Sequence, residues 1–339
     1  MRLPACSMID NDSERRQLVS TLKSRRAVLL SGAGSSMFVG YPSWGELLEQ
    51  MKATFAPSAV RTDSMSDMGF ARKIVDEIES NNCLQDYYNF LDRTFEPRLD
   101  RLKQHDDFHV ALVQLGFCGL VTTNYEEVIE SAVSEAYTTE MRPWRCGPLD
   151  LCQERSYRVF DFFQSLTSGE NPRWVLHLHG HHLNPKGIIL TEKDYQTKYG
   201  EPPTYDTYTK RPMNIILDSL HRKVLWTLFA THPLVFVGFS LNDDFFVHML
   251  HVVREDFELG SDLTHFALVG IIDDADEMKA REYLRQRNTT PVFYRVTRHS
   301  TGEEDHSDLK RLVYELAEKV GAPIVSGSIA AINKRMLEL

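Results

Sequence analysis

Four short clusters of glycine and polar residues carry the groups of this sequence that could do chemistry. Each follows directly after an apolar run that is typical of a buried strand. Because ligands of an open parallel sheet bind outside the carboxyl ends of its strands, these clusters predict one crevice along one edge of a sheet. The clusters are Ser31-Gly32-Ala33-Gly34, Thr122-Thr123-Asn124-Tyr125, His177-Leu178-His179-Gly180 and Gly238-Phe239-Ser240.

The first cluster is typical of a turn that brings backbone N–H groups, here near Ala33, Gly34 and Ser36, up to a phosphate. Glycine is favoured in such a turn because a Cβ would block both the tight backbone and the approach of a ligand. The motif is incomplete: Met37 stands where a third glycine would complete G-x-G-x-x-G, and no Gly-Lys-Ser/Thr ending follows. A purely structural turn is an open alternative for this stretch alone.

The histidine-rich cluster allows two kinds of chemistry. His177 and His179 share a face of the expected strand, and His181 and His182 follow at once. Four histidines could bind a metal ion, but a catalytic zinc needs a third protein ligand and no H-E-x-x-H motif supplies one. The sequence therefore favours a single histidine as a general base, since the pKa of imidazole lies near the working pH. For His177 a packed core residue is the alternative.

The other two clusters also have structural alternatives. Thr122-Thr123-Asn124 fits a helix N-cap as well as a binding site, and the two interpretations are compatible. Asp243 and Asp244 fit the acidic first turn of a helix, where negative charge suits the helix dipole. Only the combination of the four clusters, rather than any one of them, points to a binding site.

Strands and helices alternate along the chain, which predicts an α/β fold with a mostly parallel sheet and helices on both faces. We expect a helical insertion at about 58–115, and irregular structure at 138–172, where Pro and Gly are frequent. Strands are expected at 27–30, 117–122, 174–178, 234–237, 266–272 and 292–296. Helices are expected at 44–55, 126–137, 213–230, 243–253, 275–287 and 307–320.

Composition narrows the class of protein. The 339 residues are 42% hydrophobic and 25% charged, as in an ordinary globular protein. A formal net charge of −10 argues against duplex nucleic acid as the main ligand. Five cysteines without a C-x-x-C pair indicate neither a disulfide framework nor a four-cysteine zinc site. The sequence shows no signal peptide and no apolar run of about 18 residues, so we expect a soluble cytoplasmic protein without a membrane segment.

Taken in chain order, the clusters resemble the motifs of sirtuin-like domains, specifically those of bacterial anti-phage defence proteins that hydrolyse NAD. The resemblance spans about residues 27–296. The Gly32-Ala33-Gly34-Ser35-Ser36 and Gly40-Tyr41-Pro42-Ser43-Trp44 segments are similar to the opening GAG-x-S…G-x-P-x-W, and Thr122-Thr123-Asn124-Tyr125-Glu126 to T-T-N-Y-D. Leu178-His179-Gly180 is similar to K-L-H-G, Thr191…Asp194-Tyr195 to T-x-x-D-Y, and Gly238-Phe239-Ser240…Asp243 to G-F-S-x-x-D.

The resemblance implies a Rossmann-like fold and a division of the chain. Residues 1–25 would be a lead-in, 26–300 the NAD-binding catalytic domain with its helical insertion at about 58–115, and 301–339 C-terminal helices. Two positions depart from the family pattern: Glu126 replaces an aspartate and His177 replaces a lysine.

The resemblance also implies an activity. The protein would be an NAD+ hydrolase that cleaves the nicotinamide–ribose bond to give nicotinamide and ADP-ribose, acting as a defence effector that depletes NAD on phage infection. Asn124 and His179 would be catalytic, with NAD as substrate and no metal. The NAD-binding residues would be Gly32, Ala33, Gly34, Ser36, Pro42, Trp44, Thr123, Glu126, Gly238, Ser240 and Asp243.

Partners and alternatives follow from the same resemblance. It implies a homo-oligomer and a separate ATPase or helicase-like defence partner. A sirtuin-type protein deacylase is disfavoured because the paired C-x-x-C motifs that hold zinc in deacetylases are missing. A sensor that binds NAD or ADP-ribose without turnover is the other alternative, motivated by Glu126 and His177. The motifs give neither the activating trigger nor the identity of the partner.

Overall fold

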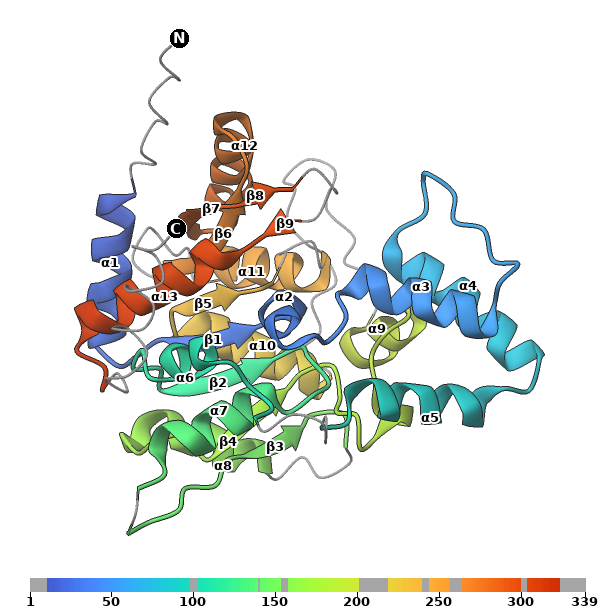
Figure 1. Ribbon diagram of the computed structural model, residues 1–339, viewed down its shortest axis with the longest axis horizontal. Helices are drawn as coiled ribbons and strands as arrows, with labels where there is room; N and C mark the ends of the chain where they lie inside the picture. Colours follow the sequence, from blue (N-terminus) through green and yellow to red (C-terminus); the bar gives the residue numbers. More distant parts are fainter. Residues whose placement is uncertain are drawn as a thin grey trace.

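A computed structural model describes residues 11–97, 103–139, 141–153, 158–200, 219–239, 244–256, 264–299 and 304–323. Its centre is a seven-stranded parallel sheet with the order β3-β4-β2-β1-β5-β6-β7 (Figure 1). The strands are β1 Val28–Ser31, β2 Gly119–Thr122, β3 Gly147–Asp150, β4 Trp174–His177, β5 Leu234–Val237, β6 His265–Ile271 and β7 Thr289–Arg295. The predicted α/β fold with a parallel sheet is confirmed.

Helices cover both faces of the sheet because alternate strand residues point to opposite sides. Leu29 packs into one core and Val28 and Leu30 into another. The first core includes α1 (Asp12–Lys23), α6 (Asp107–Val113), α7 (Val128–Tyr137) and α13 (Ser307–Val320). The second includes α8 (Arg158–Ser168), α10 (Leu220–Thr231), α11 (Asp244–Asp256) and, through Leu284, α12 (Asp274–Arg285).

A helical unit stands beside the sheet, at the right of Figure 1. Helices α3 (Trp44–Phe55), α4 (Asp67–Ser80) and α5 (Leu84–Phe95) share a third core with the loops after β2 and β4, and α9 (Glu192–Tyr199) contacts α4. Of the helices in the predicted insertion, α4 and α5 belong to this unit. Helix α6 instead packs against α7 and α13 over the sheet. The division of the chain into domains stays a prediction.

Strand β1 is the point at which the strand order reverses. It pairs with β2 on one side and with β5 on the other, so the carboxyl ends of β4, β2, β1 and β5 lie in one row. The crevice at such a switch point is where open α/β sheets bind ligands. The described residues of all four polar clusters lie at the carboxyl ends of these four strands, and for them the predicted gathering at one edge is confirmed.

Several element boundaries match the prediction and one region does not. Helices α3 and α13 and strand β5 have the expected bounds. The expectation of irregular structure at 138–172 is wrong, because β3 and α8 lie there. Gly147 and Pro148 suggested a break, but β3 is the edge strand of the sheet, where proline is tolerated. The short antiparallel pair β8 (Thr297–Arg298) and β9 (Glu304–Asp305) was not predicted. Residues 213–218 of the helix expected at 213–230 lie outside the described residues.

Candidate functional site

The loops after β1 and β5 pack backbone to backbone. Gly32 N donates a hydrogen bond to Val237 O at 2.9 Å. Gly34 N donates to Gly238 O at 3.0 Å, so this N–H is engaged within the protein rather than offered to a phosphate. A Cβ on Gly32 would lie 2.5 Å from Gly238 O, and one on Gly238 (φ +63°) would lie 2.2 Å from Ser35 N. Glycines are therefore required for the approach of one loop to the other.

Asn124 lies in the loop after β2, with its amide held toward the loop after β1. Its backbone N donates to Thr122 Oγ1 at 3.0 Å, which fixes the start of the loop. Its Nδ2 lies 3.2 Å from Gly32 O, 2.9 Å from Ser36 Oγ and 2.9 Å from Glu126 Oε1. Helix α7 begins further along the chain, so Asn124 is not its N-cap. The amide is oriented by groups from two strand ends.

Glu126 is a fully buried carboxyl group beside this amide. Ser36 Oγ donates to its Oε1, and Val128 N donates to its Oε2 at 3.2 Å. Burial raises the pKa of Glu126 in spite of these hydrogen bonds, and the nearby Glu130 adds to the rise. Glu126 thus forms a compact network with Ser36 and Asn124, in which the carboxyl accepts from both.

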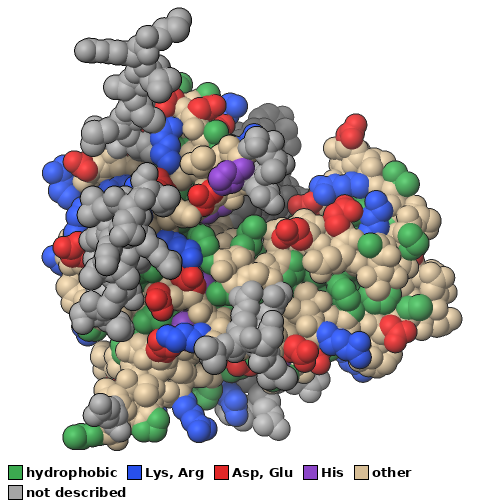
Figure 2. All heavy atoms as spheres, viewed as in Figure 1, with side chains coloured by type: hydrophobic (Ala, Val, Ile, Leu, Met, Phe, Trp, Pro, Cys, Tyr) green, Lys and Arg blue, Asp and Glu red, His purple; other side chains and the backbone are tan. Residues whose placement is uncertain are grey.

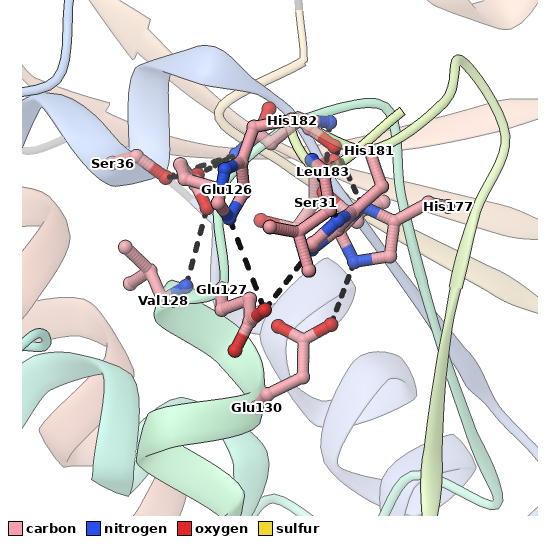
Figure 3. Close-up of polar contacts among 12 residues, drawn as sticks. Ser31, Ser36, Glu126, Glu127, Val128, Glu130, His177, His181, His182 and Leu183 are labelled. Carbon is pink, nitrogen blue, oxygen red and sulfur yellow. Dashed lines mark hydrogen bonds and ion pairs between the residues drawn. The ribbon is translucent and has the colours of Figure 1, made fainter. Parts of the chain in front are cut away.

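His177 lies at the end of β4 and contacts the loop after β2 that carries Asn124. Its Nδ1 donates to Asn124 O at 2.8 Å, and its Nε2 lies 2.6 Å from Glu130 Oε1 (Figure 3). Both side chains are almost completely buried. Burial lowers the pKa of His177, but the charge and the hydrogen bond of Glu130 raise it by more. The pKa of His177 therefore lies above its ordinary value. An imidazole with two acceptors is cationic, so His177 and Glu130 form a buried ion pair that braces the loop.

His179 is buried two residues further on, in a very different environment. Its ring is surrounded by Tyr195, Tyr199 and Phe246, whose centroids lie 5.2–6.0 Å away. Nδ1 lies 3.4 Å from Tyr195 Oη, and Nε2 is buried without a hydrogen-bond partner in the described part of the chain. Burial lowers the pKa of His179 to about 3, with a smaller contribution from His221. The ordinary pKa assumed from sequence is therefore wrong.

A cavity of about 1440 Å³ opens at the row of strand ends. His179 and Asn124 both line it, as expected for the crevice predicted from sequence. Ten of the thirteen predicted site residues are in its lining: Ala33, Gly34, Ser36, Pro42, Trp44, Thr123, Asn124, Glu126, His179 and Gly238. Gly32 does not line the cavity and lies against Gly238. Ser240 and Asp243 lie outside the described residues.

Two residues of the site were missed from sequence. Tyr195 lines the cavity beside His179 and stood in a recognised motif, but no role was inferred for it. His109 of α6 is fully buried, and its Nε2 donates to Ser35 O at 2.9 Å while its Nδ1 accepts from Asp106 N at 3.0 Å. His109 thereby ties α6 to the loop after β1. No spacing signal links it to that loop, which precedes it by more than seventy residues.

The surface carries no clear sign of a polyanion partner on the face drawn in Figure 2. Acidic and basic side chains are interspersed there, without a large field of one sign among the described residues. Among the helices that the structure describes, none is long and apolar enough to cross a membrane. These observations leave the strand-end cavity as the strongest candidate for a ligand site.

A family model described as SIR2-like domain matches residues 119–292. The chain is 21% identical over 259 residues to defense-associated sirtuin 2 of Bacillus subtilis, and the aligned region covers 73% of this chain and 21% of that protein. It is 24% identical over 246 residues to the NAD(+) hydrolase ThsA of Bacillus cereus, which covers 72% of this chain and 43% of that protein. The chain thus spans less than half the length of either curated relative.

The chain is also similar to solved structures. One of them is described as "The Structural basis of Sirtuin Substrate Affinity", is 13% identical, and covers 90% of this chain and 98% of that chain at a TM-score of 0.43.

Proposed function

The chain belongs to the SIR2-like family, whose model matches more than half of it, and from this premise we propose that it is an NAD+ hydrolase. The reaction would cleave the nicotinamide–ribose bond and give nicotinamide and ADP-ribose. The observation that carries the proposal is the unpartnered, buried Nε2 of His179 in the lining of a cavity that Asn124 also lines. A buried polar atom without a partner is costly unless a ligand completes it.

The cavity fits the proposed substrate in size and in chemistry. Ligand pockets commonly measure about 300–1,000 Å³. The cavity of about 1440 Å³ exceeds this range, so it has room for a ligand as long as an extended dinucleotide. The lining also includes Lys279 of α12 and Lys310 of α13, and Lys310 is paired with Asp106 at 2.8 Å. The lining therefore offers polar groups for a ribose and basic side chains whose charge has the sign that favours phosphate.

Cleavage of an N-glycosidic bond passes through an oxocarbenium-like transition state, so the protein must orient the ribose and stabilise positive charge. Asn124 would orient the ribose or the attacking water, with its amide positioned by Ser36 and Glu126. His179, neutral because burial lowers its pKa to about 3, would accept a proton through Nε2. The buried carboxyl of Glu126 would provide negative charge next to the ribose when ionised.

A sensor that binds NAD or ADP-ribose without turnover is the second candidate. It is favoured by the engagement of Asn124 Nδ2 with three acceptors and of Gly34 N with Gly238 O, which leaves these donors occupied within the protein. The pKa of His179, lowered to about 3, is also far from the working pH at which a general base is most effective, which favours binding without turnover. A protein deacylase has no comparable support.

The test compares turnover with binding. Purified protein is incubated with NAD and nicotinamide release is measured, while calorimetry measures the affinity for ADP-ribose. Asn124→Ala and His179→Ala should abolish release, and the exposed control variants Asn89→Ala and His299→Ala should not. Full activity in either of the first two variants would refute the residue assignments. Tight binding without release would favour the sensor, and neither binding nor release would contradict both candidates.

The biological setting is part of the proposal. We propose that the protein acts in the cytoplasm in defence against phage by NAD depletion; the name of one curated relative gives a defence association and the name of another gives NAD hydrolysis. Assembly into a homo-oligomer and activation by a separate ATPase or helicase-like partner remain proposals from the family resemblance. Light scattering of the purified chain, with and without NAD, measures the first of these.

A further inference from the structure

A second cluster of ligand-type side chains lies outside the strand-end cavity. Glu127 precedes α7, and His181 and His182 lie in the loop after β4 (Figure 3). One ligand atom from each lies within 4.8 Å of the others. Among the described residues this is the one group of three or more such side chains, and none of its members lines the cavity. We propose that Glu127, His181 and His182 bind a divalent ion of the zinc class.

The separations suit one shared ion. His181 Nε2 lies 3.3 Å from Glu127 Oε1, and His182 Nε2 lies 3.9 Å from the same oxygen. Zinc–nitrogen and zinc–oxygen bonds of about 2.0–2.2 Å place two ligands of a tetrahedral site about 3.3–3.5 Å apart. The first separation therefore matches, and the second needs a shift of a few tenths of an ångström (Figure 3).

Two buried nitrogen atoms lack any other partner. The side chains of His181 and His182 are each 3% exposed, and neither Nε2 makes an aligned hydrogen bond in the described part of the chain. Both atoms are turned toward Glu127, the more accessible member of the cluster (Figure 3). Burial without a partner destabilises a polar atom, and a metal bond removes that cost.

The surrounding groups hold the side chains in the form that metals bind. Asp92 Oδ1 lies 3.0 Å from His182 Nδ1, which places the ring proton on Nδ1 and leaves the Nε2 lone pair free. Metals bind the neutral imidazole through an unprotonated nitrogen, so Asp92 holds His182 in a tautomer that an ion can bind.

His181 needs one rearrangement. Leu183 N lies 3.3 Å from its Nδ1, at the long end of hydrogen-bond distances. Ligation through Nε2 requires the proton on Nδ1, so the metal bond would replace this weak contact. The ion would then connect the start of α7 with the loop after β4, and through Asp92 with α5. The same loops carry Asn124, whose carbonyl His177 holds, so the metal would brace the site without entering it.

This inference departs from the expectation of no metal, and it does not depend on NAD cleavage. The protein is dialysed against a chelator and titrated with zinc by calorimetry, and cobalt is added separately to record the visible absorption of a four-coordinate site. We expect one zinc per chain and no competition from magnesium, because magnesium prefers oxygen ligands. Zinc binding by a chain that leaves NAD intact would support the metal site and count against turnover by the isolated chain, so the two proposals can fail separately.

Variants separate this site from adventitious binding. Glu127→Gln and His182→Ala should each lose most of the zinc affinity, and Asp92→Asn should weaken it by about 10–100-fold through the orientation of His182. The exposed matched controls Glu49→Gln and His299→Ala should keep the affinity of the parent. Circular dichroism confirms that each variant is folded, and Glu127→Gln preserves the shape of a partly exposed side chain. Equal zinc affinity in the parent and the first two variants, or no zinc binding by the parent, would overturn the proposal.

Discussion

Gly238→Ala should destabilise the protein strongly, because the added Cβ meets two independent obstacles. Gly238 has φ +63°, and a left-handed conformation costs an L-residue about 1–2 kcal/mol. The Cβ would also lie 2.2 Å from Ser35 N and 2.8 Å from Gly34 C, both backbone atoms that no rotamer change can move. Overpacking of this kind costs about 1–3 kcal/mol. The expected loss of about 2–5 kcal/mol is a large share of the about 5–15 kcal/mol that stabilises a typical domain.

Two other glycines isolate the two contributions. Gly169 has φ +68° with nothing within 4 Å of its Cβ position, so Gly169→Ala measures the conformational cost alone. Gly45 lies in α3 with open space and no positive φ, so Gly45→Ala should stabilise by up to about 1 kcal/mol. Urea unfolding of the three variants gives the differences. If Gly238→Ala costs no more than Gly169→Ala, the loops after β1 and β5 do not pack as described and the reasoning is refuted.

Three further predictions concern stability. Glu130→Ala should lower the free energy of unfolding by about 3–5 kcal/mol, since it leaves His177 buried without its partner. A double variant that adds His177→Leu should recover part of this loss. Equal losses in the single and the double variant would mean that the two side chains are not coupled. Thr191→Ala should cost about 1 kcal/mol by removing the capping box of α9, whereas Thr197→Ala, in the middle of α9, should change stability by less than about 0.5 kcal/mol. Burial lowers the pKa of His265 to about 4, so the unfolded chain binds a proton that the folded protein does not. Stability should therefore fall by up to about 3 kcal/mol as the pH drops from about 6.5 to 4, and unfolding of His265→Gln should lose that part of the slope.

The parallel sheet could be predicted because its strands are short apolar runs separated by helical periodicity. Leu234–Val237, for example, is apolar at every position, as a strand buried on both faces must be. Strand β3 could not be predicted in this way, because it is not an apolar run. Its Gly147-Pro148 start is half-exposed at the sheet edge, so neither an apolar run nor an alternation marks it. An apolar or alternating sequence pattern arises from burial, and this edge strand is buried too little to show such a pattern.

The location of the candidate site residues was more predictable than their hydrogen-bond partners. Strand-end position brought Asn124, His179 and Gly238 together, since every parallel strand delivers its carboxyl end to the same edge. The role of Gly34 was not predictable, because its N–H partner, Gly238 O, lies in the loop after β5, about two hundred residues away. Contacts of His109 with Ser35 were hidden for the same reason. Local motifs mark which loops meet, and the hydrogen bonds between loops depend on the tertiary fold.

His177 and His179 show why the electrostatic environment of each histidine could not be predicted from sequence. The two rings are two residues apart and both are buried, yet the pKa of His177 is raised and that of His179 is lowered to about 3. The difference comes from what faces each ring. Glu130 of α7 supplies a carboxylate to His177, whereas aromatic rings from α9 and α11 surround His179. A charged His177 is therefore committed to the loop that it holds, and the neutral His179 keeps a free nitrogen for whatever enters the cavity.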